Sequence, residues 1–279
     1  MFTDYHVHSY YSDDSEYPME QIVQKAVSNG IEELCFTDHV DYGIKSDWTD
    51  QSETYLPEEK AKLPVMNVKY SAYHAEILQL QNQYQDRIKI KEGLEFGIQR
   101  HTIAQYQKLI ASYPLDFVIL SCHQVENKAF WNQNFQTGRT QREYNEKYYF
   151  EIQEVISKFK DYSVLGHLDL IKRYDKAGFY PFENVSEFVS DILKTAIHDG
   201  KGIEINTSSV RYGLPEWLPS KDILMLYKSL GGEIITFGSD AHNEKQLGAF
   251  IPQAMNELKE YGFRYFCTFD KMKPIFHKL

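Results

Sequence analysis

The stretch FTDYHVHSYYSDDSEYPMEQIVQKAVSNGIEELCFTDH, residues 2–39, contains one complete strand–helix–strand unit. Short apolar runs at Phe2–His6 and Glu33–Thr37 predict strands, and the amphipathic run Met19–Ser28 between them predicts a helix. Gly30 follows the predicted helix closely, where glycine commonly ends one. Two strands joined by a helix form a parallel pair, so this stretch places the chain among the α/β proteins.

The same alternation of strand and helix continues along the chain and gives seven rounds in all. Further strands are predicted at Ile88–Gly93, Asp116–Ser121, Tyr162–Gly166, Gly202–Ile205 and Glu233–Gly238. Further helices are predicted at Val68–Tyr84, Ile98–Ser112, Gln141–Lys160, Val185–Asp199, Lys221–Leu230 and Lys245–Tyr261. Seven such units form either a closed barrel or an open doubly wound sheet. No linker or repeat interrupts them, so we predict a single α/β domain over residues 1–279.

The charge balance bears on the class of partner. The chain has 279 residues, with 30 Lys and Arg against 40 Asp and Glu, and a net charge of −10. We expect no nucleic-acid partner, because proteins that hold long nucleic acid neutralise its phosphates with a basic face. No apolar run long enough for a membrane span and no signal peptide is visible, so no membrane partner is expected. Three cysteines form no disulfide framework, which favours a cytoplasmic location. The oligomeric state is left open.

Histidine and carboxylate side chains gather where the predicted strands end. Six of the ten histidines lie there, together with three acidic residues. The nine residues are His6, His8, Asp14, His39, Glu95, His123, His167, Asp240 and His242. In parallel α/β barrels this end of the strands carries the functional site. A single histidine after a strand is more often structural. Six packed together would lack partners when neutral and repel when protonated, unless a metal is bound.

The spacing of these residues supports a metal site. His6 and His8 are two residues apart, which places both imidazoles on one face of a strand. Asp240 and His242 repeat this geometry on the last strand, which neighbours the first if the barrel closes. Nitrogen and carboxylate ligands without thiolate suit Zn²⁺, Mn²⁺ or Fe²⁺. Nine ligands exceed the needs of one tetrahedral ion and indicate a cluster of two or three.

Long connections follow several strands at the same end, and such connections are often functional. The four longest are Val40–Asn67, Gln124–Thr140, Leu170–Asn184 and Asn206–Ser220. Lys172, Arg173 and Arg211 lie in them, either as solvated surface charges or as ligands of a phosphate group. Asp38 and Asp169 flank histidines and are candidates to orient an imidazole. The other histidines are assigned to structure or solvent: His74, His101, His198 and His277.

Taken together, these motifs resemble the polymerase and histidinol phosphatase (PHP) family. The matching pieces are His6-x-His8, the downstream Asp14, Thr37-Asp38-His39, Gly-Leu-Glu95, Ser-x-His123, Gly-His167-x-Asp169 and Ser-Asp240-Ala-His242. They span most of the chain, from Met1 to about His242. The run CFTDHVDYG, residues 35–43, further resembles the stand-alone histidinol-phosphate phosphatases of Gram-positive bacteria.

The resemblance implies a distorted (β/α)7 TIM-like barrel with three divalent transition metals at the carboxyl ends of its strands. One metal would be held by His6, His8, Glu95 and Asp240. A second would share Glu95 and be held by His123 and His167. The third would be held by Asp14, His39 and His242, where many relatives have histidine in place of the aspartate. Glu95, Asp240 and His242 are the candidate catalytic residues.

The activity that the resemblance implies is hydrolysis of L-histidinol phosphate to L-histidinol and phosphate by a metal-activated water. The partner is then a small phosphorylated metabolite, with Arg173 and Arg211 as candidate phosphate ligands. The candidates to hold the substrate's imidazole and ammonium groups are Asp41, Tyr42, Glu126 and Trp131. The alternatives are another small phosphate ester (a sugar phosphate, a nucleotide or a phosphotyrosyl peptide) or a non-catalytic PHP binding module.

Overall fold

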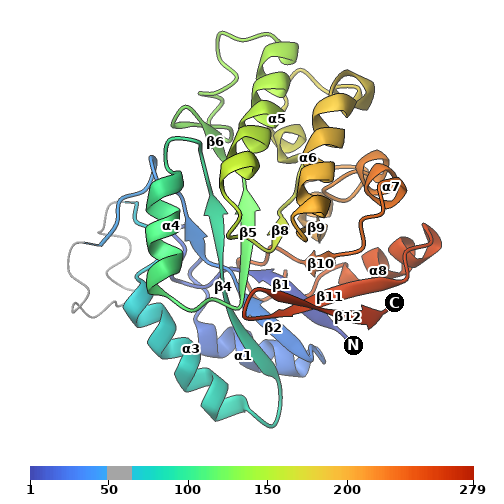
Figure 1. Ribbon diagram of the computed structural model, residues 1–279. Coiled ribbons are helices and arrows are strands. Elements are labelled where there is room, and N and C mark those ends of the chain that lie inside the picture. The colour runs from blue at the N-terminus through green and yellow to red at the C-terminus, as the bar shows by residue number, and fades with distance from the viewer. Residues whose placement is uncertain (49–64) are drawn as a thin grey trace.

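Seven parallel strands form a nearly closed barrel with helices on its outside (Figure 1). The computed structural model describes residues 1–48 and 65–279. The barrel strands, in hydrogen-bonded order, are β1 (Thr3–Val7), β2 (Glu33–Phe36), β4 (Lys89–Gly97), β5 (Phe117–Ser121), β8 (Val164–Leu165), β9 (Gly202–Asn206) and β10 (Ile235–Gly238). The short strand β3 (His39–Val40) pairs with β4 after β2 has ended. The sequence prediction of seven strand–helix rounds is confirmed.

The first and last strands of the sheet contact each other, so the sheet forms a nearly closed barrel and not an open sheet. Val7 bridges Ala241 in parallel register, just after β10 ends. The backbone N–H of His8 donates to the Ala241 carbonyl at 2.9 Å. The Ser239 N–H donates to the Asp4 carboxylate at 2.9 Å. These contacts bring the residues that follow β1 and β10 to the same place.

The helices follow the predicted pattern, with small changes at their ends. They are α1 (Met19–Ser28), α3 (Tyr70–Tyr84), α4 (Ile103–Ser112), α5 (Gln141–Lys158), α6 (Ser186–His198), α7 (Lys221–Ser229) and α8 (Ile251–Glu260). The largest difference is at α4 and α8, which begin five and six residues later than expected from Ile98 and Lys245. Before α4, the Gln99 N–H donates to the Thr102 hydroxyl in a separate turn. This local side-chain bond competes with the first helical turn.

Buried tyrosines tie the helices to the strands and loops that carry the polar residues. Tyr73 on α3 donates to the Gly93 carbonyl at 2.8 Å, and Tyr106 on α4 donates to the Val40 carbonyl at 2.8 Å. Tyr148 on α5 donates to the Leu168 carbonyl at 3.1 Å. Each ring fills core volume while its hydroxyl satisfies a backbone carbonyl, so the outer layer fixes the strand ends.

A carboxyl-terminal hairpin, which the sequence analysis did not predict, covers the opposite end of the barrel. Its strands are β11 (Tyr265–Asp270) and β12 (Lys273–Lys278), paired antiparallel. The Met272 N–H donates to the carbonyl of Asp116, which directly precedes β5. His277, which the sequence assigns to structure or solvent, lies on β12 with its Nε2 2.9 Å from the Thr268 hydroxyl. The turn residues Lys271 and Met272 have φ of 48° and 65° without glycine or asparagine, so the usual turn signal is missing.

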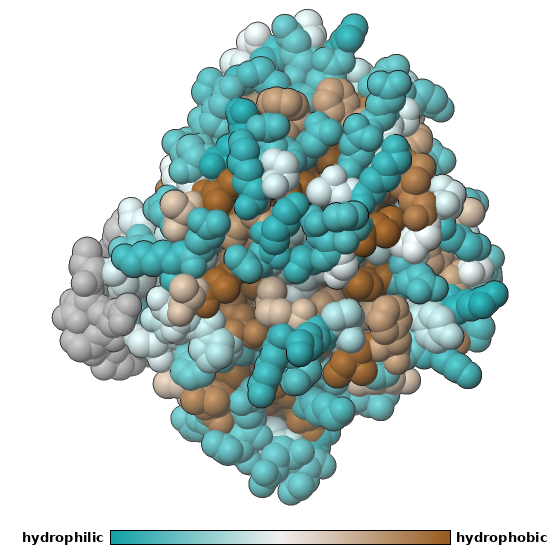
Figure 2. All heavy atoms as spheres, viewed as in Figure 1, coloured by the Kyte–Doolittle hydropathy of each residue, from teal (hydrophilic) through white to brown (hydrophobic). Residues whose placement is uncertain are grey.

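The long connections at the carboxyl end contain short elements of their own. These are the hairpin β6 (Gln124–Val125) and β7 (Lys128–Ala129), and the 3-10 helices η1 (Leu170–Tyr174), η2 (Phe182–Asn184) and η3 (Thr207–Tyr212). The connection predicted at residues 40–67 is described only at its two ends. On the face shown in Figure 2, hydrophilic residues predominate and apolar residues form separate patches. None of the helices in the described ranges is long and apolar enough to cross a membrane.

Candidate metal centre

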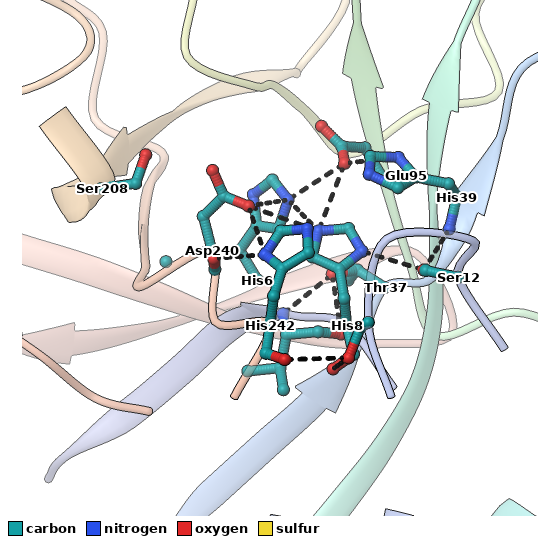
Figure 3. Close-up of polar contacts among 12 residues, drawn as sticks. His6, His8, Ser12, Thr37, His39, Glu95, Ser208, Asp240 and His242 are labelled. Atoms are coloured by element: carbon teal, nitrogen blue, oxygen red, sulfur yellow. Dashed lines mark hydrogen bonds and ion pairs between the residues drawn. The ribbon is translucent and has the colours of Figure 1, made fainter. Parts of the chain in front are cut away.

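All nine predicted metal ligands meet at the carboxyl ends of the barrel strands. His6 lies on β1, His39 on β3 and Glu95 on β4, while the others follow their strands by a few residues. Figure 3 shows the imidazoles of His6, His8, His39 and His242 pointing toward one another, with Glu95 and Asp240 beside them. Segments far apart in the chain therefore build one site.

The first group lies deepest in the site. The two histidines of β1 approach each other, with His6 Nε2 3.0 Å from His8 Nε2. Glu95 Oε2 lies 3.1 Å from His6 Nε2, and Asp240 Oδ1 lies 3.4 Å from His8 Nε2. Both histidine side chains are fully buried. Two nitrogens and two carboxylate oxygens thus face the same small volume.

Glu95 also faces a second group through its other oxygen. Its Oε1 lies 2.8 Å from His167 Nε2 and 3.1 Å from His123 Nε2. The Ser121 hydroxyl donates to the same oxygen at 2.7 Å. The carboxylate therefore stands between two sets of imidazoles, which is the position of a bridging ligand.

A third group lies nearer the surface. Asp14 Oδ2 is 3.1 Å from His242 Nε2 and 3.5 Å from His39 Nε2. The His8 ring stacks on the rings of both histidines, with centroids 4.3 Å from His39 and 4.2 Å from His242. The Asp14 side chain is half exposed, so this group opens toward solvent.

The chemistry of the donor set fits bound cations. Among the described residues, four groups of three have ligand atoms within 4.8 Å of one another. His39 Nδ1 lies 3.1 Å from Glu95 Oε2, and among the described residues the buried Nδ1 atom of His167 has no hydrogen-bond partner. Burial lowers the pKa of His8, and the neighbouring His242 and His39 lower it further. Burial alone would raise the pKa of Glu95, but the adjacent His6 and His123 hold it well below its usual range. Despite its burial, the adjacent Glu204 and Glu95 raise the pKa of His6. A metal ion binds a neutral imidazole, so metal binding would displace a proton from this ring.

Outer partners fix three of the imidazoles, and two of these partners are carboxylates. Glu204 Oε1 lies 2.5 Å from His6 Nδ1, and Asp41 Oδ1 lies 2.9 Å from His123 Nδ1. The Ser12 hydroxyl lies 3.1 Å from His8 Nδ1. Such contacts select the ring tautomer and orient the opposite nitrogen. Sequence reasoning missed the role of Glu204, although a glutamate inside a fully buried strand signals a paired charge.

The two aspartates expected to orient imidazoles do something else. Asp38 accepts hydrogen bonds from the Ser9 N–H and from the Ser12 hydroxyl, so it reaches His8 only through Ser12. Asp169 accepts from the Ser220 N–H and pairs with Lys172. That expectation is corrected for both residues, because serine and lysine donors lie nearer to their carboxylates.

Two site residues have strained backbones. His167 has φ of 22° and Asp240 has φ of 54°, a region that residues other than glycine seldom adopt. Arg211 supports the strained segment by donating to the carbonyls of Ser239 and Asp240, both at 2.7 Å. Strain of this kind persists only where surrounding contacts over-determine the conformation, and it concentrates at functional sites.

The site opens into a cavity of about 290 Å³. Beyond the candidate ligands, its wall includes Lys45, Trp131, Arg173, Tyr174 and Tyr212. The Arg173 side chain is 7% exposed, with its guanidinium 4.0 Å from the Tyr212 ring centroid and 3.6 Å from Asp240 Oδ2. Its Nη2 donates to the Ser208 hydroxyl at 2.5 Å. Arg173 is therefore held in place and faces the candidate metal ligands.

The structure separates the two arginines that were expected to act alike. Arg173 lines the cavity, whereas Arg211 is absent from the wall that the described residues form. Among the candidates for the substrate's imidazole and ammonium groups, Asp41 and Trp131 line the cavity. Tyr42 packs on Tyr106. Glu126 pairs with Arg139 and Lys147 at the exposed rim.

The four remaining histidines lie outside the cluster. His74 pairs with Glu92 at 2.7 Å, and His101 contacts Asn127. His198 is exposed beside Asp199 at the end of α6, and His277 belongs to the hairpin at the other end of the barrel. The structure thus divides the ten histidines into the six and four that the strand-end pattern predicts.

Comparison with known proteins agrees with this geometry. A family model described as the PHP domain matches residues 4–208. The histidinol-phosphatase of Lactococcus lactis subsp. lactis (strain IL1403) is 34% identical over 275 residues, which cover 97% of this chain and 95% of that protein. A probable histidinol-phosphatase of Thermotoga maritima is 28% identical over 273 residues, which cover 96% of each chain.

A solved structure of similar shape provides a further comparison. It is the histidinol phosphate phosphatase of L. lactis, complexed with zinc, L-histidinol and phosphate. It superposes with a TM-score of 0.82 at 33% sequence identity, and the match covers 98% of both chains.

Proposed function

This chain belongs to the PHP domain family, and on that premise we propose that it hydrolyses L-histidinol phosphate to L-histidinol and phosphate with a cluster of divalent metal ions. The observation that carries this proposal is the cluster of six imidazoles and three carboxylates, because seven of these nine groups line one cavity whose wall also includes a buried arginine. The histidinol-phosphatase from L. lactis, similar over nearly its whole length, supports the same substrate.

We assign three metals to the three groups of ligands. His6, His8, Glu95 and Asp240 would hold the first, and His123 and His167 would hold the second together with Glu95. Asp14, His39 and His242 would hold the third. Zinc is present in the L. lactis structure, and the donor set here also suits manganese and iron. When bound, these ions supply Lewis acidity toward phosphate oxygens and make a nucleophile available from water near neutral pH.

Residues around the candidate ligands orient the imidazole rings. Glu204, Asp41 and Ser12 fix the rings of His6, His123 and His8. The opposite nitrogens therefore face the other candidate ligands. Glu95 offers one oxygen to each of two imidazole groups and keeps them at a fixed separation. Positions held in this way cost little reorganisation when the substrate reacts.

Arg173 is the residue best placed to bind the phosphate group. It lines the cavity beside Asp240, and Tyr212 and Ser208 prevent its guanidinium from turning away. A planar guanidinium matches the geometry of two phosphate oxygens. Arg211, which holds the backbone of the strained Asp240 segment, acts on the site through that segment.

The size of the cavity and the net charge of the chain both favour a small ester as substrate. A cavity of about 290 Å³ suits one small molecule, and the chain's net charge of −10 disfavours a polynucleotide. The imidazole and ammonium groups of the substrate would find Trp131 and the acidic residues of the same wall. Aromatic and carboxylate surfaces are suitable contacts for a cationic heterocycle.

A phosphate-release assay over a panel of monoesters tests the proposal. We expect L-histidinol phosphate to give the highest kcat/KM, ahead of sugar phosphates, nucleotides and a phosphotyrosyl peptide. Chelation should abolish release, and added Zn²⁺, Mn²⁺ or Fe²⁺ should restore it. A higher kcat/KM for another ester would identify that ester as the substrate in place of L-histidinol phosphate. If the metal-loaded protein hydrolyses no ester, the alternative of a non-catalytic binding module is favoured.

A further inference from the structure

Glu204 is a carboxylate inside the barrel that does not belong to the nine candidate ligands. It lies in the middle of β9, and its side chain is 1% exposed. Gly238 on β10 leaves room for it, because a Cβ atom at that position would overlap both Glu204 Oε1 and the Cβ atom of His6. Burial of a carboxylate is costly unless hydrogen-bond donors surround it. The donors around Glu204 therefore indicate its role.

The two oxygens of Glu204 contact two different groups of candidate ligands. Oε1 lies 2.5 Å from Nδ1 of His6, which belongs to the first group. Oε2 accepts a hydrogen bond of 3.0 Å from the backbone N–H of His167, which belongs to the second group. The side-chain amide of Asn206 donates to the same Oε2 at 3.3 Å. One carboxylate therefore links β1 to the segment that follows β8.

His6 and His167 are thereby held between two carboxylates. Glu95 contacts their Nε2 atoms at 3.1 and 2.8 Å, and it belongs to the wall of the cavity. Glu204 contacts the ring of one and the backbone of the other, and it is absent from the wall that the described residues form. Glu204 therefore acts on the site through these two histidines and not on a molecule in the cavity.

The contact with His167 falls where the backbone is strained. His167 has φ of 22°, and such a conformation persists only where surrounding contacts over-determine it. Within the described ranges its Nδ1 atom has no hydrogen-bond partner, so no outer side chain orients this ring as Glu204 orients the ring of His6. The bond from the His167 N–H to Glu204 is the contact that holds this residue from outside the cavity.

We propose that Glu204 is a positioning residue that couples the first and second metal positions by holding one ligand of each. The inference rests on the metal centre of the proposed function, and it adds a link between two positions to the orientation of a single ring. Loss of Glu204 should weaken both positions and leave the third, formed by Asp14, His39 and His242, as it is. An amide cannot replace the carboxylate, because it has one oxygen acceptor and an NH2 group that only donates.

Competition titration of the metal-free protein with Zn²⁺ against a chromophoric chelator tests this coupling without any substrate. Glu204→Met keeps a side chain of similar length but removes both acceptors. Two of the three equivalents should then bind about 10–100-fold more weakly, the usual cost of losing an outer partner, while the remaining one keeps its affinity. Glu204→Gln retains one acceptor, so it should weaken one equivalent by a similar factor.

Two further variants are matched controls. Glu33→Met removes another buried strand glutamate, which contacts the Tyr5 hydroxyl at the opposite end of the barrel. It should leave the affinity of every equivalent unchanged. Asp41→Ala removes an outer partner whose nearest candidate ligand is His123, in the second group. It should weaken one equivalent.

Unchanged affinities in Glu204→Met, or weakening of a single equivalent, would overturn the proposal. Weakening of two equivalents in Asp41→Ala would also overturn it, because the shared Glu95 would then transmit any disturbance between the two positions. If Glu204→Met does not fold, an unchanged titration of Glu204→Gln would overturn the proposal.

The proposed function fails separately, if the parent binds Zn²⁺ but hydrolyses no ester. The titrations then still test Glu204, since they measure metal affinity alone. If the parent binds no Zn²⁺, both proposals are wrong.

Discussion

The two ends of the barrel are built from the same strands but hold opposite kinds of interior. At the amino end, Tyr5, Phe117 and Phe269 pack edge to face and tilted, with ring centroids 4.9 and 5.0 Å apart. At the carboxyl end, buried histidines and carboxylates fill the interior around the cavity. The register of β1 against β2 shifts between Asp4 and Val7. Tyr5 and His6 lie within this irregular stretch. Tyr5 belongs to the apolar cluster, and His6 belongs to the candidate metal centre.

The amino end of the barrel serves stability, and the carboxyl end holds the candidate metal centre. At the amino end, the Phe269 N–H donates to the Tyr5 hydroxyl at 2.8 Å, and this hydroxyl in turn contacts Glu33. At the carboxyl end, the Nδ1 atom of His167 has no hydrogen-bond partner among the described residues, and His167 and Asp240 have strained conformations. We therefore expect substitutions at the amino end to change stability alone and those at the carboxyl end to change metal content and rate.

The largest effect is expected at Glu95. Glu95→Gln removes the carboxylate that faces two imidazole groups, so it should lower kcat/KM by more than about 10²-fold, beyond the loss typical of outer partners alone. It should also release metal, which elemental analysis measures. His74→Ala, which alters a histidine outside the cluster, should change neither quantity. If the two variants behave alike, the division of the histidines is wrong.

At the amino end, Phe269→Ala gives the complementary result. The side chain is 2% exposed, and its loss should reduce the free energy of unfolding by about 3–5 kcal/mol. Denaturant unfolding measures this change. The kcat and metal content of the folded fraction should match those of the parent. A loss of metal in the folded variant would show that the two ends are coupled.

Next in size is the contrast between the two arginines. Arg173→Ala should lower kcat/KM by roughly ten- to a hundredfold, because a charge-assisted hydrogen bond to phosphate contributes about 1.5–3 kcal/mol. Arg173→Lys should recover only part of the loss, since an ammonium group cannot bind two oxygens at once. Arg211→Ala should reduce metal content as well, because it frees the Asp240 backbone. Intact metal in that variant would contradict the positioning role.

The smallest effect is expected in the pH dependence of thermal stability, which should reverse its sign when the metal is removed. Burial opposes protonation, but in the metal-free chain Glu95 and Asp41 raise the pKa of His123 to about 10, and Asp14 raises that of His242 to about 9. Both values exceed the ordinary 6.5, so this contribution to stability is complete below pH 6.5 and is lost as the pH rises through 9 and 10. Thermal melts of the chelated protein should show Tm falling over this range.

In the metal-loaded protein, Tm should instead rise with pH over the range in which the imidazoles lose their protons, because metal binds neutral imidazole. Equal slopes of Tm against pH with and without metal would show that these histidines are not metal ligands.

Short-range patterns in the sequence predict a parallel α/β sheet and the clustering of the nine ligands, because the carboxyl ends of parallel strands share one edge. Strand–helix alternation alone does not separate a closed barrel from an open sheet, and the barrel was implied by the resemblance to the PHP family. The partners of those ligands were not predictable in the same way. Asp41 and Glu204 acquire their roles from contacts between segments distant in the chain, Asp41 with His123 and Glu204 with His6. The β11–β12 hairpin was missed because its turn lacks glycine and asparagine.

Titration of the metal-free protein with Zn²⁺ or Mn²⁺, followed by elemental analysis and by hydrolysis of L-histidinol phosphate, measures how many metal ions the activity requires. Three groups of ligands predict more than two bound equivalents per chain at saturation, with activity rising until the third is bound. Full activity with one equivalent or fewer per chain would contradict the three-metal centre.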